Sequence, residues 1–380
     1  CRRPMATCSN CLSPSRSRLE KEGGADYEIH RPTSRSLRLG LGQQGIFPRG
    51  MPPRVGAMRT PFLACIYFLT LLSIGCGAGC SRQGDRLAEI EGISLLEVEH
   101  AFSTSFAELA WSPDGRSVAV HAYTELNNGT VTIVDLLTGT TRDIYESGGP
   151  YMLGPEWSPD GQSLIFAAPR ESIPHQGAVV VADAATGQII QNLGFGGYAT
   201  WTADLENVIV LGFDSSCREE IPIYEYNLTT GTRRILGSTI SCFAESAHRL
   251  DASADGKLVV ADDTGTKTQI LSITDGVELG ALAPPLRRET VWSPSGTMLA
   301  FLDGGMNSDV EDDGILFARA DGACLSDPLR LGAELLSLDW SPDGNQLVFS
   351  TRDANRLYFL DLTTGVGRQL MDSYRERCVD

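Results

Sequence analysis

The chain has 380 residues, of which 42% are hydrophobic and 21% are charged, so it is neither a disordered tail nor a multi-span membrane protein. Residues 1–75 carry 11 Lys and Arg against 4 Asp and Glu, whereas the rest of the chain carries 20 against 44. Phosphate groups bind to cationic surfaces, so a body this acidic excludes nucleic acids and anionic lipid headgroups as partners.

The first 80 residues are interpreted as a leader that lies outside the fold. Residues 1–57 show no apolar periodicity and are rich in Arg, Ser, Gly and Pro, so we interpret them as a non-native or disordered segment, with Met51 or Met58 as the start. Residues 61–74 then form an apolar run that follows Arg54 and Arg59. This run is too short to cross about 30 Å of hydrocarbon comfortably as a helix, but it has the length of the apolar region of a signal peptide.

Two cysteines, Cys76 and Cys80, follow this run after small residues. Residues 58–80 resemble a bacterial lipoprotein signal peptide, although Ser73 and Gly77 stand where that family prefers Leu. The resemblance implies a lipid on Cys76, with Cys80 as the alternative, and a protein anchored at the periplasmic side of the outer membrane or at the cell surface. An ordinary cleaved signal peptide or a retained anchor helix would also place the acidic body outside the cytoplasm.

One unit recurs in the rest of the chain, and its first marker is Trp-Ser-Pro-Asp-Gly. Four copies are intact or nearly so and two are degenerate, with Ala252 at the Trp position of the fourth copy. The marker residues are Trp111, Asp114 and Gly115; Trp157, Asp160 and Gly161; Trp201; Trp292 and Gly296; and Trp340, Asp343 and Gly344. Successive copies are 46, 44, 51, 40 and 48 residues apart, which is the period of a four-stranded propeller blade.

The marker predicts a hairpin turn, because its Ser bonds back to the chain, its Pro fixes φ and its Gly accepts a left-handed conformation. A second marker, an apolar strand ending in Thr-Gly or Asp-Gly, lies about 24 residues after each Trp position. Each unit therefore predicts four strands, A to D, with strand D following the second marker. The fold class is all-β, a six-bladed β-propeller over residues 102–380 without helices. We place the blades at about 102–147, 148–193, 194–237, 245–281, 287–330 and 334–372, with residues 81–101 as a tether that includes a strand for ring closure.

The repeats resemble the PD40, or WD40-like, repeat of TolB-type six-bladed propellers over about 70% of the chain. The additional N-terminal α/β domain of TolB has no counterpart here, so the resemblance implies a propeller-only lipoprotein. We expect the tryptophans to pack between neighbouring blades as core residues, because indole rings are bulky and apolar.

The strand order predicts two unlike faces. In an antiparallel meander the A–B and C–D turns share one face, and the B–C and D–A loops, which vary in length, share the other. Function in such folds concentrates in variable loops on a rigid scaffold. Cys217 and Cys242 both fall on this variable face and would form a disulfide in an oxidising compartment. Cys324 and Cys378 remain as a second pair with less favourable geometry, and free thiols are the alternative.

Two weak metal patterns occur in the body. Asp309, Glu311 and Asp313 resemble part of a calcium loop, because alternate carboxylates before a Gly can wrap a hard cation, but an exposed acidic loop is the simpler interpretation. His121, His175 and His248 could approach the variable face as transition-metal ligands, although their spacing is not that of a metal motif.

The sequence favours a binding module. It holds no Gly-x-Ser-x-Gly, phosphate-binding-loop or zinc-protease motif and no Gly-x-Gly-x-x-Gly after a predicted strand, so no catalytic residues are assigned and no cofactor is expected, calcium excepted. We expect the variable face to dock a protein or cell-wall partner with a basic or polar patch, as an envelope interaction scaffold. The alternative is a metal-dependent lyase, lactonase or esterase with its site at the channel mouth.

Overall fold

The computed structural model describes residues 86–98, 107–123, 128–147, 153–169, 177–212, 221–239, 249–261, 268–282, 289–303, 313–352 and 355–378. All of them belong to the second of the two compact units into which the chain divides, residues 76–380. The leader, Cys76 and Cys80 lie outside the described residues. No helix among those described is long and apolar enough to cross a bilayer.

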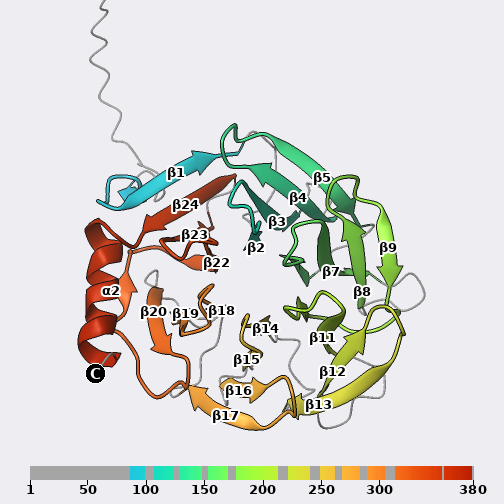
Figure 1. Ribbon diagram of the computed structural model, residues 1–380. Coiled ribbons are helices and arrows are strands. Elements are labelled where there is room, and N and C mark those ends of the chain that lie inside the picture. The colour runs from blue at the N-terminus through green and yellow to red at the C-terminus, as the bar shows by residue number, and fades with distance from the viewer. Residues whose placement is uncertain are drawn as a thin grey trace, which may run out of the picture. The chain divides into compact units, whose positions relative to one another are not determined.

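Six four-stranded antiparallel sheets form a ring of blades around a central axis (Figure 1). Blade 1 contains β2 (Glu108–Trp111), β3 (Ser117–Tyr123), β4 (Gly129–Asp135) and β5 (Thr141–Glu146). Blade 2 contains β6 (Leu153–Trp157), β7 (Ser163–Pro169), β8 (Gly177–Asp183) and β9 (Ile189–Asn192). Blade 3 contains β10 (Ala199–Trp201), β11 (Asn207–Leu211), β12 (Ile221–Asn227) and β13 (Arg233–Thr239). The first strand of each blade lies at the channel and the last at the rim.

Blades 4 and 5 follow the same order. Blade 4 contains β14 (Arg249–Ala252), β15 (Lys257–Ala261), β16 (Thr268–Ser272) and β17 (Glu278–Leu282). Blade 5 contains β18 (Thr290–Trp292), β19 (Met298–Asp303), β20 (Gly314–Arg319) and the short β21 (Leu329–Arg330). The predicted six-bladed, all-β architecture is thus confirmed.

The sixth blade closes the ring with a strand from the other end of the chain. It contains β22 (Leu335–Trp340), β23 (Gln346–Thr351) and β24 (Arg356–Asp361), and its rim strand is β1 (Ile93–Glu97). The antiparallel register of β1 and β24 runs from Ile93 opposite Leu360 to Glu97 opposite Arg356. The prediction of a strand D after the last Thr-Gly, and of no helix, was therefore wrong.

The segment after β24 is instead the helix α2 (Gly365–Cys378). It cannot add to the sheet, because β1 already occupies the outer edge of β24. Leu370, Tyr374 and Cys378 follow one another at four-residue intervals and are buried, so one helical face packs against blades 5 and 6. A disulfide between Cys378 and Cys324, with Cα atoms 5.5 Å apart, joins the end of this helix to blade 5.

The core is divided among the blade junctions. Six clusters of buried apolar side chains fill the six junctions, one between each pair of neighbouring sheets. Trp111, Trp201, Trp292 and Trp340 are buried in them, and Trp157 is half-buried. The indoles therefore serve as core side chains that hold neighbouring sheets together.

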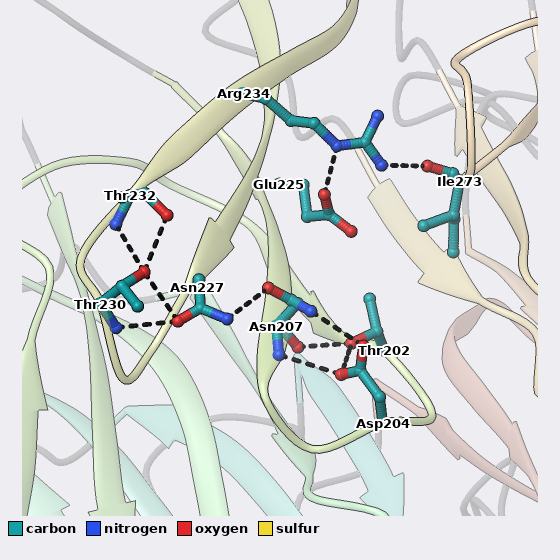
Figure 2. A network of polar contacts seen from close by, with 9 residues as sticks. All are labelled: Thr202, Asp204, Asn207, Glu225, Asn227, Thr230, Thr232, Arg234 and Ile273. Atoms are coloured by element: carbon teal, nitrogen blue, oxygen red, sulfur yellow. Dashed lines mark hydrogen bonds and ion pairs between the residues drawn. The ribbon is translucent and has the colours of Figure 1, made fainter.

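The two repeat turns of a blade lie on one face and are closed by their own side chains, as Figure 2 shows for blade 3. Thr202 donates to Asp204, whose carboxylate accepts the backbone N–H of Asn207, and Asn227 donates to the Asn207 side chain, joining the two turns. In other blades hydroxyl donors hold the pKa of the turn carboxylates below the usual value. These turn aspartates are Asp114, Asp135, Asp183 and Asp343, bonded to Ser112, Thr138, Thr186 and Ser341 respectively.

The rim strands also bind the next blade. Arg142, Gln191 and Arg234 each donate from a rim strand to a main-chain carbonyl of the following C–D turn. In the turns that Arg142 and Arg234 bind, the neighbouring main chain comes close enough to require a glycine. At Gly276, where φ is +73°, an added Cβ would overlap the main-chain carbonyl of Leu236.

Candidate functional site

The inner strands of all six blades line a cavity of about 80 Å³ in the central channel. Five carboxylates contribute to its lining, and no Lys or Arg does so among the described residues. They are Glu108, Glu156, Asp251, Glu289 and Asp339. None of these five acids was assigned a role from the sequence.

Three of the carboxylates join one blade to the next, each as an acceptor for the first strand of the following blade. Asp339 of blade 6 accepts the backbone N–H of Trp111 at 2.6 Å, and Asp251 of blade 4 accepts that of Trp292 at 2.5 Å. Glu156 of blade 2 accepts the backbone N–H of Trp201 at 3.1 Å. We call these three residues the bridging carboxylates.

Blade 3 makes the same bridge with a hydroxyl. The Thr200 side chain donates to Glu156 at 2.8 Å and accepts the backbone N–H of Ala252 at 3.2 Å. Glu156, Thr200, Asp251 and Asp339 all stand directly before the Trp position of their repeat. The sequence signal was therefore a polar residue at one fixed repeat position of an otherwise apolar strand.

Glu108 forms a second polar group at the cavity wall. Its carboxylate contacts His121 Nδ1 at 3.3 Å and accepts a hydrogen bond from the Tyr198 hydroxyl at 3.1 Å, so it spans from blade 1 to blade 3. It passes directly over Gly154, where an added Cβ would lie 2.6 Å from Glu108 Oε2. His121 is buried, with 1% of its surface exposed.

The bridging carboxylates are crowded and partly withdrawn from water, which changes their acidity. Burial raises the pKa of Asp251 to about 7, against the backbone donors that lower it. Burial, together with the charge of Asp251, also raises the pKa of Asp339 to about 7. The pKa of Glu156 is raised well above its usual value by burial and then by Asp251. The cluster therefore holds protons at a pH where exposed carboxylates are ionised.

The residues singled out in the sequence are distributed as follows. His121 contacts Glu108, while His175 and His248 lie outside the described residues. Asp313 is buried and accepts the backbone N–H of Leu335 at 3.0 Å, which connects blade 5 to blade 6. Its calcium partners Asp309 and Glu311, and the predicted Cys217–Cys242 disulfide, also lie outside the described part of the chain.

The chemistry available at the cavity is that of hydrogen-bond acceptance and proton binding. Each bridging carboxylate already accepts at least one hydrogen bond from a neighbouring blade. Over the described ranges, no three His, Cys, Asp or Glu side chains are arranged to hold a metal ion.

No family model and no curated protein matches the chain. Among solved structures it is similar to TolB from Acinetobacter baumannii, with 22% identity, a TM-score of 0.45, and coverage of 60% of this chain and 52% of that one. The matched part thus spans about half of that TolB chain. A putative TolB from Agrobacterium tumefaciens matches at 15% identity and a TM-score of 0.49, over 70% of this chain and 98% of that one.

A chain of the mitotic checkpoint complex matches at 15% identity and a TM-score of 0.48, over 82% of this chain and 99% of that one. At such identities the likeness concerns the fold alone. The six four-stranded sheets themselves confirm the six-bladed propeller that the repeats predict.

Proposed function

We propose that this chain is a non-catalytic, extracytoplasmic, lipid-anchored propeller that docks a protein or cell-wall partner on its variable-loop face. The observation that carries the proposal is the contrast between its two faces. The A–B connections have four or five residues in all six blades, whereas the B–C connections range from four to ten. Uniform turns closed by their own hydrogen bonds serve the scaffold, and loops of unequal length supply specificity.

Two further features support the proposal. The Cys324–Cys378 disulfide fits an oxidising compartment outside the cytoplasm. The excess of acidic residues in the body favours a partner whose contact patch is basic or polar. The partner itself would be an envelope protein or a cell-wall polymer, for which the ring acts as an interaction scaffold.

Site-specific photo-crosslinking in intact cells tests the docking face. The photoreactive residue is placed at Ser216 or Ser308 in the B–C loops, with Leu137 as the matched control, because it is 93% exposed on the turn face. We expect the two loop positions to capture the same species and Leu137 to capture none. Equal capture from Leu137, or no capture from either loop, would contradict the proposal.

The anchor is tested separately by the mass of the mature N-terminus. We expect acylation at Cys76, lost in Cys76→Ser, with Cys80→Ser as the control. An N-terminus that carries no lipid would leave the docking proposal in place and remove the anchor from it.

A further inference from the structure

The bridging carboxylates perform two tasks that oppose each other. Glu156, Asp251 and Asp339 each hold a backbone N–H of the next blade, a contact to which a negative charge adds strength. All three also line one cavity of about 80 Å³, where negative charges repel one another through a medium less polar than water.

No positive side chain relieves this repulsion among the residues that line the cavity. The groups that face the bridging carboxylates are Glu108 from β2, Glu289 from the residue before β18, and the Tyr198 hydroxyl beside β10. His121 of β3 lies behind Glu108 and contacts it. Among the lining residues whose side chains are described, β10, β14, β18 and β22 contribute no further titratable group.

We propose that the inner strands form a proton-linked clasp, in which the folded ring binds protons at the bridging carboxylates and loses cohesion between blades as those protons leave with rising pH. A protonated carboxyl keeps a carbonyl oxygen that accepts the neighbouring N–H, and it no longer carries the negative charge. Partial protonation of the bridging carboxylates therefore keeps the contacts between blades and lowers the repulsion among the acids. Full ionisation leaves the acceptors in place but adds repulsion across the channel.

The direction of the pH dependence follows from the difference between folded and unfolded chains. In the folded ring Asp251 and Asp339 have a pKa of about 7, whereas in an unfolded chain the value is 3.8. Between these values the folded form binds more protons, so its stability falls as pH rises, and the loss is complete above about pH 7. Each group can change the unfolding equilibrium constant by up to about tenfold per pH unit in that window.

The test is urea unfolding of the full chain at a series of pH values from 5 to 9, followed by tryptophan fluorescence. The wild type is compared with Asp251→Asn/Asp339→Asn, whose amides keep the acceptor oxygen without the charge, and with Asp343→Asn, a matched control at an exposed turn. We expect the unfolding constant of the wild type and of Asp343→Asn to rise by up to about a thousandfold per pH unit between pH 5 and 7, up to about tenfold for each bridging carboxylate. We expect a rise of no more than about tenfold per pH unit in the double variant, where Glu156 is the bridging carboxylate that remains.

A wild type whose stability is constant between pH 5 and 8, or a double variant that keeps the same pH dependence, would overturn the proposal. If the double variant does not fold, proton exchange decides the question with the wild type alone. Unfolding at pH 6 should release up to about three protons, measured by calorimetry in two buffers of different ionisation enthalpy. Proton uptake, or no exchange, would refute the clasp.

Discussion

Loss of the Cys324–Cys378 disulfide should weaken the whole propeller, because the bond closes a long stretch of chain. Its cysteines are 54 residues apart. Between them lie β21 of blade 5, three of the four strands of blade 6 (β22 to β24) and most of α2. For a loop of this length the entropy that a cross-link removes from the unfolded chain corresponds to about 4 kcal/mol. Native-state relaxation commonly reduces such values, so we expect Cys324→Ser to lower the free energy of unfolding by about 2 to 4 kcal/mol.

The assay is urea unfolding of wild type, Cys324→Ser and Cys324→Ser/Cys378→Ser. Since the bond needs both sulfurs, the single variant should lose nearly as much stability as the double variant. Cys378 is buried, so its replacement adds only a smaller packing loss. A Cys324→Ser protein as stable as the wild type would refute the reasoning, because it would show that the bond does not constrain the unfolded chain.

Three further predictions concern the repeat turns. Leu205 adopts a φ of +63° at the turn position where the other copies have Gly. Leu205→Gly should therefore stabilise the fold by about 1 kcal/mol and raise the melting temperature by about 2 °C. A lowered melting temperature would contradict this. Gly276→Ala should lower the free energy of unfolding by about 2 to 4 kcal/mol in urea, because the new Cβ meets the carbonyl of Leu236. The control Gly256→Ala, where φ is also positive but the space around the residue is open, should lower it by about 1 kcal/mol. Equal losses would exclude the overlap as the cause. The turn aspartates have a lowered pKa in the fold, so the stability they contribute is present above pH 3.8 and should be lost as pH falls below it; a melting temperature that does not fall between pH 3.8 and pH 2.5 would be inconsistent with this.

The blade architecture could be predicted from the sequence because its signals are local. A Trp-Ser-Pro-Asp-Gly turn depends on residues within five positions of one another, and each copy repeats the same hydrogen bonds, as Ser112 with Asp114 and Ser158 with Asp160 show. Six copies at a nearly constant interval then leave few arrangements other than a ring.

The end of the chain could not be predicted in the same way, because two segments compete for the same strand edge. β1 and the residues after β24 could each pair with the outer edge of β24. Residues 365–378 follow a Thr-Gly marker just as the rim strands do, but β1 occupies the edge to which they would have paired. The four-residue spacing of Leu370, Tyr374 and Cys378 indicates a helix, and the repeat pattern concealed it.

The cavity was missed for a different reason. Glu156, Asp251 and Asp339 are far apart in the sequence, and each by itself is an ordinary polar residue at the end of a strand. Only the closed ring brings them to one channel and shows that each accepts a hydrogen bond from the next blade. Aligning the six repeats by their Trp position would have revealed them as members of one column.

The pairing of β1 with β24 has a consequence for biosynthesis. β1 is among the first parts of the body to be made, and its only sheet partner is completed last, with Ile93 opposite Leu360. A chain that is synthesised from its N-terminus can therefore close the ring only after β24 has been made. Until then β1 and the unfinished blades present unpaired strand edges to which other chains can pair, so aggregation during synthesis is the hazard that this topology carries.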